Sequence, residues 1–254
     1  MFNLNFVGFT MHTAPITTRG TKMKISLKDR WLCIFNNDAI DVSELENAYD
    51  IIVSCYSQPH RTYHTLKHIE HMLDKIDNMT QVYMLQCETD KKALYLATWF
   101  HDIVYSTNES FNDNEILSAN YARNMLVQIG ITDDYLLQTI HQLILSTKHH
   151  APDPHLPIDL LLQEILIDAD LSILGDNADI YNTYVNEVTK EWSHLESSTF
   201  RTGRVVFLTH MLNKNGIFHS EYMRELYGEQ SILNMKAELS NLDKLNVEYL
   251  ISTL

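Results

Sequence analysis

The chain has 254 residues, a formal net charge of -14 and 45% hydrophobic residues, but only 7 glycines and 5 prolines. The acidic balance excludes the large Lys- and Arg-rich surface that binding a nucleic-acid polymer requires. Few turn formers, together with apolar residues at helical spacing, predict an all-α fold with a substantial core.

The first 22 residues lack clean helical periodicity and are predicted to form a flexible extension, which leaves 23–254 as one helical domain. No early cationic region precedes an apolar run, as a signal peptide would require. No segment approaches the ~20 apolar residues of a membrane helix, so we expect a cytoplasmic protein without a membrane partner. The cysteines Cys33, Cys55 and Cys87 form no CxxC motif and are interpreted as buried free thiols in a reducing compartment.

Apolar periodicity predicts helices along most of the chain. Asp41 or Ser43 is the expected cap of the second helix, and Gly130 closes the fifth. Gly228 leaves open whether the last helix is broken. Residues 149–157 contain three of the prolines and are predicted to form a loop beside the pocket. The expected helices are 27–35, 42–56, 63–76, 90–104, 112–128, 133–147, 159–174, 178–192, 198–212 and 221–242.

An ordered set of metal-ligand types follows the chain in apolar surroundings. His64 and His68 are four residues apart, so a helix would place both on one face. His101 and Asp102 end an apolar helix, and Asp170 lies in a distant apolar run. Buried polar groups of this kind are costly unless something binds them. Imidazole nitrogens and carboxylate oxygens together suit a divalent cation.

These residues resemble the HD superfamily of metal-dependent phosphohydrolases, whose pattern is a histidine, a His-Asp pair and a distant aspartate. The chain is most similar to a branch of predicted HD-superfamily hydrolases, and the likeness covers roughly positions 25 to 240. The resemblance implies a single HD-domain helical bundle with additional C-terminal helices. It also implies that His68, His101, Asp102 and Asp170 hold a divalent metal ion. The motifs that carry it are RxYHxxxHI at 61–69, FHDxVY at 100–105, Asp113-Asn114-Glu115 with Ser118 and Ala119, DADLxxLG at 168–175, and Gly203-Arg204.

The YHxxxH and ADLS stretches also resemble cyclic-nucleotide phosphodiesterases, which implies that His64 is the general acid and His68 a ligand. A hydrogen bond from His64 to a carboxylate is the alternative. Glu115 could orient or deprotonate the attacking water, or it could be a first-turn carboxylate favoured by the helix dipole. Thr189 departs from the arginine expected in many relatives, which puts a cationic substrate contact there in doubt.

Four further residues are candidates for substrate binding: Arg61, Lys148, His150 and Arg204. Arg61 could hold a phosphate through its guanidinium fork or pair with Asp102 or Glu115. Arg204 could reach the phosphate or pair with Glu191.

Other polar residues have structural interpretations. His149 and His150 would allow a second ion only if His71 or Glu115 joined them. Asp168 is interpreted as a partner of a nearby polar group rather than a ligand. Tyr181 and Tyr184 are interpreted as core packing rather than a nucleobase site.

The sequence therefore predicts a metal-dependent phosphohydrolase that acts on a small phosphorylated metabolite, with nucleotides among the candidates. The alternatives are a phosphodiesterase that cleaves a cyclic or other diester, and a non-catalytic protein that binds a metal or a ligand. An oxygenase with paired iron would need the second ion. The donor set accepts Mn, Fe, Co, Ni, Zn or Mg, and the sequence indicates no oligomeric state.

Overall fold

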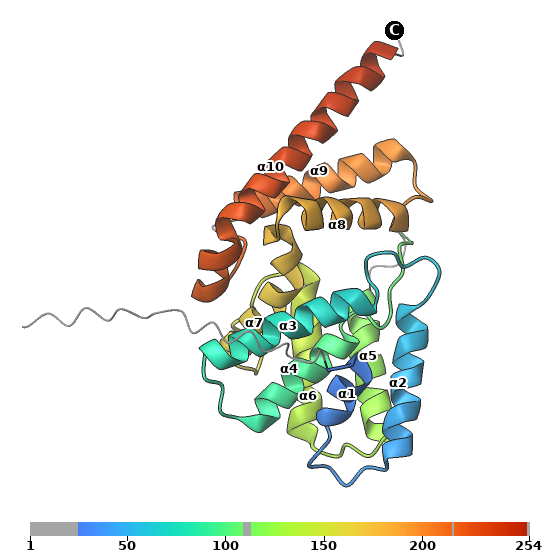
Figure 1. Cartoon of the computed structure of the whole chain (residues 1–254), viewed down its shortest axis with the longest axis vertical. Helices are drawn as coiled ribbons and strands as arrows, with labels where there is room; N and C mark the ends of the chain where they lie inside the picture. The colour runs from blue at the N-terminus through green and yellow to red at the C-terminus, as the bar shows by residue number, and fades with distance from the viewer. Residues whose placement is uncertain (1–24, 109–112, 215, 253–254) are drawn as a thin grey trace, which may run out of the picture.

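The computed structural model describes residues 25–108, 113–214 and 216–252, with side chains as far as residue 242. Within these residues the secondary structure is helical and contains no strand (Figure 1). The predicted all-α class is confirmed. The extension predicted at 1–22 lies outside the described residues.

The helices follow one another with short connections. The α-helices are α1 (Leu27–Cys33), α2 (Val42–Tyr56), α3 (Leu66–Val82), α4 (Glu88–Phe100), α5 (Asn114–Gln128), α6 (Asp134–Ser146), α7 (Leu160–Leu171), α8 (Ala178–Glu191), α9 (Ser197–Asn213) and α10 (Glu221–Ser252). The 3-10 helices are η1 (Thr147–His149) and η2 (Ser172–Gly175).

Side-chain caps explain where several helices begin. Asp41 accepts a hydrogen bond from the backbone N–H of Ser43 at the start of α2, as predicted. Thr65 does the same for Lys67, so α3 begins three residues later than its predicted start at Tyr63. His64 therefore precedes the helix, and the prediction that it shares a helical face with His68 was wrong.

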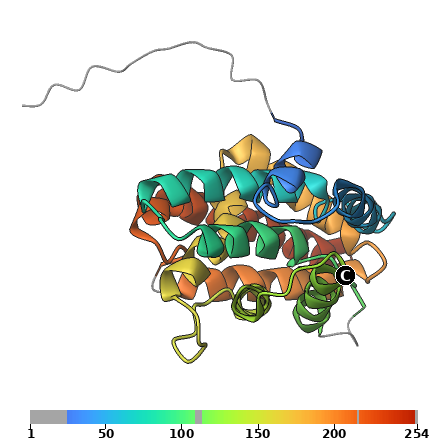
Figure 2. The same ribbon diagram turned by 90° about the horizontal axis from the view of Figure 1, so that it is seen from below.

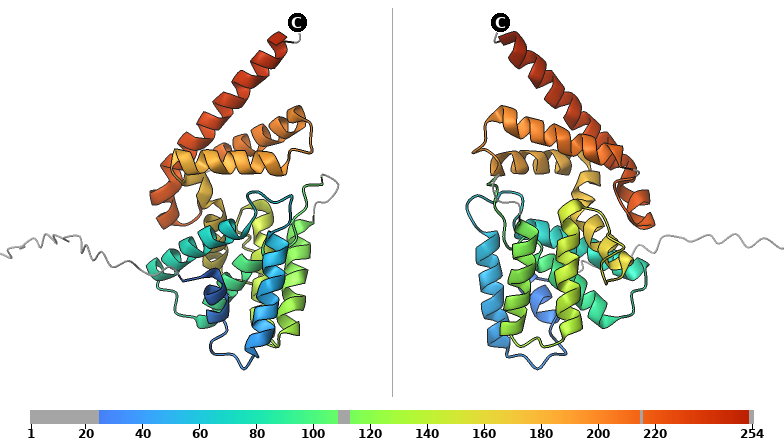
Figure 3. Two further views of the ribbon diagram at one scale, coloured as in Figure 1. Left: turned by 45° about the vertical axis from the view of Figure 1, so that its right-hand side comes forward. Right: turned by 180° about the vertical axis from the view of Figure 1, so that it is seen from behind.

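The helices form two layers. In the lower bundle, α4 contacts α3, α5, α6 and α7, and α3 also contacts α7. Viewed from below, α3 and α4 run side by side (Figure 2). An upper layer of α8 and α9 covers one end of the bundle, and α10 leans across it (Figure 3). α10 is continuous through Gly228, so the break considered for that position is absent.

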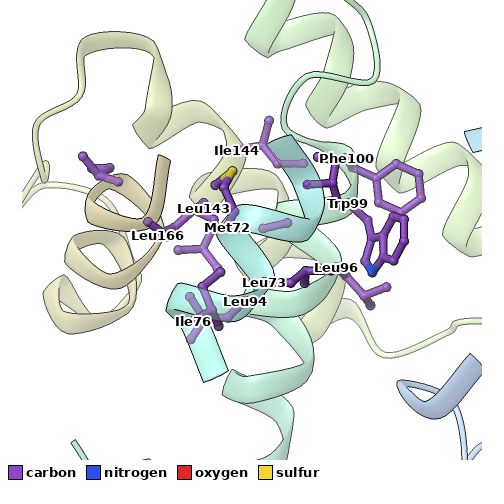
Figure 4. Packing of buried hydrophobic residues seen from close by; sticks show 14 of the residues in the cluster. Met72, Leu73, Ile76, Leu94, Leu96, Trp99, Phe100, Leu143, Ile144 and Leu166 are labelled. Atoms are coloured by element: carbon purple, nitrogen blue, oxygen red, sulfur yellow. The ribbon is translucent and has the colours of Figure 1, made fainter. Parts of the chain in front are cut away.

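The core of the lower bundle is apolar. Met72, Leu73 and Ile76 of α3 lie against residues of α4, α6 and α7 (Figure 4). Trp31 of α1 packs edge-on to Trp99, with ring centroids 5.7 Å apart. This packing fixes the relative positions of the helices that carry the candidate ligands.

The cysteines are not part of this core. All three are free thiols, but Cys33 and Cys87 are exposed and Cys55 is half-buried. The prediction of buried thiols was wrong because Cys33 is the last residue of α1 and Cys87 precedes α4, where the chain leaves the core.

None of the described helices combines the length and the apolarity that crossing a bilayer requires.

Candidate metal centre

Three helices of the lower bundle bring the four predicted ligands together. His68 lies in the first turn of α3. His101 is the C-cap of α4, and Asp102 follows it. Asp170 lies in the last turn of α7. Because α3, α4 and α7 contact one another, their ends meet and point these side chains at a common centre.

The separations between ligand atoms suit one ion. The Oδ2 atom of Asp102 lies 3.0 Å from Nε2 of His101 and 3.8 Å from Nε2 of His68. The two Nε2 atoms are 3.2 Å apart. The Oδ1 atom of Asp170 lies 3.3 Å and 3.9 Å from Nε2 of His68 and His101. Two ligands ~2.1 Å from one ion stand ~3.0 Å apart at right angles and ~4.2 Å apart when opposite. The residues therefore fit a divalent ion, and His68, His101 and Asp102 could hold one.

The environment of His101 orients it for this role. Its Nδ1 lies 2.9 Å from the carbonyl oxygen of Thr98, so a proton on Nδ1 leaves the lone pair of Nε2 facing the centre. Burial lowers the pKa of His101, but Asp102 and Asp170 outweigh burial and raise it to about 9. The two carboxylates thus make the centre favourable for positive charge.

The carboxylates themselves are held ionised. Burial raises the pKa of Asp102 and of Asp170, but the neighbouring histidines more than offset burial and leave both pKa values below the usual range. Burial lowers the pKa of His68, which favours the neutral imidazole that binds metals.

His64 is held beside this centre by Glu191 of α8. Its Nδ1 lies 2.7 Å from Oε2 of Glu191, while its Nε2 lies 4.0 Å from Oδ2 of Asp102. The other oxygen of Glu191 accepts hydrogen bonds from the backbone N–H groups of Thr62, Tyr63 and His64, at 2.7 to 2.8 Å. Burial lowers the pKa of His64, but Glu191 and Asp102 outweigh burial and raise it. Glu191 therefore fixes Nδ1 of His64 and leaves Nε2 facing the candidate metal centre.

Arg61, a predicted phosphate ligand, is engaged with the backbone. Its guanidinium donates to the carbonyl oxygens of Asp102 at 2.6 Å and Ile103 at 2.9 Å, and it packs over the ring of Tyr56. It does not pair with the Asp102 carboxylate or with Glu115 among its described contacts. Arg61 holds the segment after α4 in place, so positioning Asp102 fits its geometry better than binding phosphate.

A cavity of about 320 Å³ opens onto the centre. His64, Glu115, His150 and Arg204 line it, in addition to the ligands His101, Asp102 and Asp170. The structure thus gathers most of the predicted site residues around one space. Lys148 does not line it, and its Nζ lies 3.9 Å from Asp113.

His150 contacts the ligand set directly. Its Nε2 lies 3.3 Å from Oδ2 of Asp170, while the Oδ1 atom of the same carboxylate faces His68. The residue has a left-handed backbone, with φ 47° and ψ 44°. Its carbonyl oxygen accepts a hydrogen bond from Nζ of Lys214 at 3.0 Å and lies 3.1 Å from Nε2 of His219. The residues after α9 therefore hold His150 in place, and His150 is the one residue of the loop predicted at 149–157 that lines the cavity.

A second ion finds less support in the geometry. His71 does not line this cavity; its Nε2 lies 2.8 Å from Oγ of Ser172 and 3.4 Å from Asp176. Burial lowers the pKa of His71 to about 3, which keeps the ring neutral in this network.

Buried polar contacts join the upper layer to the bundle. Asp168, which is fully buried, accepts hydrogen bonds from the backbone N–H groups of His219 and Ser220, both at 2.8 Å, and this confirms its structural interpretation. Arg204 binds Glu238 of α10 through two nitrogens, at 2.7 and 3.1 Å. The considered pair between Arg204 and Glu191 was wrong, because Glu191 belongs to His64.

The two tyrosines of α8 belong to the same network. Tyr181 is 2% exposed and donates to Glu238, while Tyr184 is 7% exposed and accepts from Arg204 at 3.0 Å. Their interpretation as packed residues is confirmed. Tyr184 also lines the cavity, which the sequence did not indicate.

Sequence reasoning missed the roles of Glu191 and Glu238. Glu191 is 127 residues from His64 in the chain, and no spacing rule links the two. An acidic residue at a position that helical periodicity places on the apolar face was the available signal.

Comparison with known proteins adds no relative. No protein-family model, no curated protein and no solved structure matches the chain.

Proposed function

We propose that the protein is a metal-dependent phosphohydrolase of the HD type that acts on a small phosphorylated metabolite. One observation carries the proposal: His68 and His101 each lie 3.0 to 3.9 Å from both Asp102 and Asp170, beside a cavity that His64 also lines. The order of these residues in the chain resembles the HD pattern.

The ligand set suits the chemistry of phosphate ester hydrolysis. A bound divalent ion supplies charge neutralisation at the phosphoryl oxygens and makes a water molecule more acidic. Two histidines and two carboxylates leave positions of an octahedral ion open. The two carboxylates balance a 2+ charge, so the centre can still accept an anion.

His64 is the proposed proton donor to the leaving oxygen. Its Nδ1 is fixed by Glu191, so its Nε2 is directed into the cavity. A protonated His64 would give its Nε2 proton to the departing alkoxide. Glu115 lines the same cavity and is the proposed residue for orienting water.

The experiment combines metal analysis with an activity assay. The purified protein is analysed for bound metals. Phosphate release from small phosphate monoesters is then measured with added Mn, Mg, Co, Ni, Fe or Zn. Asp102→Ala is expected to lose both the ion and activity. His64→Gln is expected to keep the ion and lose about 100-fold or more in kcat.

The outcomes separate the alternatives. Cleavage of bis-ester but not monoester substrates, which frees an alcohol and leaves a phosphate monoester, would assign a phosphodiesterase instead. A metallated protein that releases no product from either class, and binds small phosphorylated ligands without turnover, would contradict an enzymatic role.

A further inference from the structure

The cavity beside the candidate metal centre is lined by polar and by apolar side chains. The candidate ligands, His64 and Glu115 are among the polar ones. The upper layer and η2 contribute an apolar wall. Its members include Ile173, Leu174, Tyr184, Val188, Trp192 and Phe207.

This apolar wall is firmly held. Leu174 is 1% exposed and Val188 is 8% exposed. The carbonyl oxygen of Leu174 accepts a hydrogen bond from Asn234 of α10 at 2.9 Å. Tyr184 packs edge-on against Tyr63, with ring centroids 4.7 Å apart. The guanidinium of Arg204 lies over the rings of Tyr184 and Phe207, 5.1 and 4.9 Å from their centroids, but Glu238 neutralises its charge. The wall therefore favours a ligand whose body is uncharged and largely apolar, because charged groups would lose hydration there.

Lysine and arginine are scarce among the described residues that line the cavity. Arg204 is the one such residue in that lining, and Glu238 already neutralises it. The protonated His64 proposed as the acid faces the ester bond that breaks. Asp102 and Asp170 would balance a divalent ion, and Glu115 adds a further negative charge. A second or third phosphate group would therefore meet no unpaired lysine or arginine among the described lining residues.

The size of the cavity limits the ligand as well. Its volume of about 320 Å³ is near the lower end of the ~300–1,000 Å³ typical of ligand pockets. It has room for one small organic group and one phosphate.

From these three features we infer that the substrate is a phosphate monoester of a small, uncharged, largely apolar alcohol, bound with its organic group against Tyr184 and Phe207. The inference rests on the proposed function. It adds that diphosphates and triphosphates are poor substrates, and that the apolar group contributes to substrate binding.

Two substrate series test the inference on the unmodified, ion-loaded protein. In the first, phenyl phosphate, phenyl diphosphate and phenyl triphosphate differ only in phosphate count, and kcat/KM should fall about tenfold or more from the monophosphate to the triphosphate. In the second, methyl and phenyl phosphate differ in the apolar group, and phenyl phosphate should have the lower KM.

A variant on the apolar wall locates the binding of the organic group. Phe207→Ala should raise KM for phenyl phosphate about tenfold with a smaller effect on kcat. Val206→Ala is the matched control, because Val206 is the preceding residue of α9 and is 63% exposed. Phe207→Leu, which keeps an apolar side chain, guards against a folding defect and should give an intermediate KM.

Each outcome has one meaning. A phenyl triphosphate that is hydrolysed as well as phenyl phosphate, or a methyl ester with the same KM as the phenyl ester, would overturn the inference while the hydrolase assignment stands. If the ion-loaded protein releases phosphate from none of these substrates, the proposed function fails and the inference falls with it.

Discussion

The two layers of the molecule are held together in different ways. The lower bundle relies on apolar packing, in which residues such as Ile76 and Leu94 are fully buried. The upper layer shares in this apolar cluster but adds buried polar contacts to it, among them Glu191 with the segment before α3 and Asp168 with the segment before α10. Apolar packing places the backbones that carry the ligands. Hydrogen bonds, which are directional, fix the orientation of side chains such as His64.

This contrast predicts separable effects of substitution. A change in the bundle should cost stability without altering the site of molecules that remain folded. A change in a polar contact should alter the site as well.

The largest loss of stability is expected from Arg204→Ala. Removing Arg204 leaves Glu238 buried without its positively charged partner, which should lower the free energy of unfolding by about 3–5 kcal/mol. Urea denaturation measures the loss. The double variant Arg204→Met with Glu238→Leu is the control and should recover most of it. A double variant no more stable than the single one would show that the pair is not the cause.

A large loss confined to stability is expected from Ile76→Ala. Ile76 is fully buried and lies roughly 12 Å along α3 from His68. The cavity left behind should cost about 2–5 kcal/mol. Isothermal titration with a divalent ion should find the affinity of the folded protein little changed. A strong loss of affinity would mean that packing and ligand placement are not separable.

Glu191→Gln should affect stability in a pH-dependent way. Burial raises the pKa of Glu191, but hydrogen bonds and charge from His64 and the backbone outweigh burial and lower it to about 2. Because the pKa is depressed in the folded state, this stabilisation is present above the ordinary value of 4.5 and is lost as pH falls towards 2. The Glu191→Gln variant should be less stable than the unmodified protein at neutral pH. Its free energy of unfolding should fall less than that of the unmodified protein between pH 4.5 and pH 2.

The measurement for Glu191 is the free energy of unfolding at several pH values for both proteins. It should be joined by the pH profile of kcat, which reports on His64. If the free energy of unfolding falls equally with decreasing pH in both proteins, Glu191 is not the source of the pH dependence.

A smaller loss is expected from Gly175→Ala. A Cβ atom at this position would lie 2.5 Å from Cβ and 2.6 Å from the carbonyl oxygen of Tyr227, so α10 would have to move. Overpacking of this kind costs about 1–3 kcal/mol. Gly203→Ala on α9 meets no atom within 4 Å and should instead stabilise the protein by about 0.5–1 kcal/mol. Thermal unfolding of the two variants should therefore shift in opposite directions.

Local rules predicted the bundle well and the orienting contacts poorly. The bounds of α2 were predicted correctly because apolar periodicity and the Asp41 cap agree. The start of α3 was not, although Thr65 is a good capping residue; the motif that carries His64 and His68 was taken for continuous helix. The cluster of His68, His101, Asp102 and Asp170 was predictable because carboxylates and imidazoles in apolar runs require partners. The pairs of His64 with Glu191 and of Arg204 with Glu238 depend on how the layers meet, which no local pattern encodes.

The left-handed backbone of His150 sets two requirements against each other. A non-glycine residue in this conformation is strained by about 1–2 kcal/mol, which glycine would avoid. The hydrogen bond from Lys214 to its carbonyl oxygen helps to hold the strained conformation. Glycine at position 150 would relax the loop and remove the imidazole beside Asp170. The loop is therefore shaped by where that ring must lie rather than by its own lowest-energy conformation.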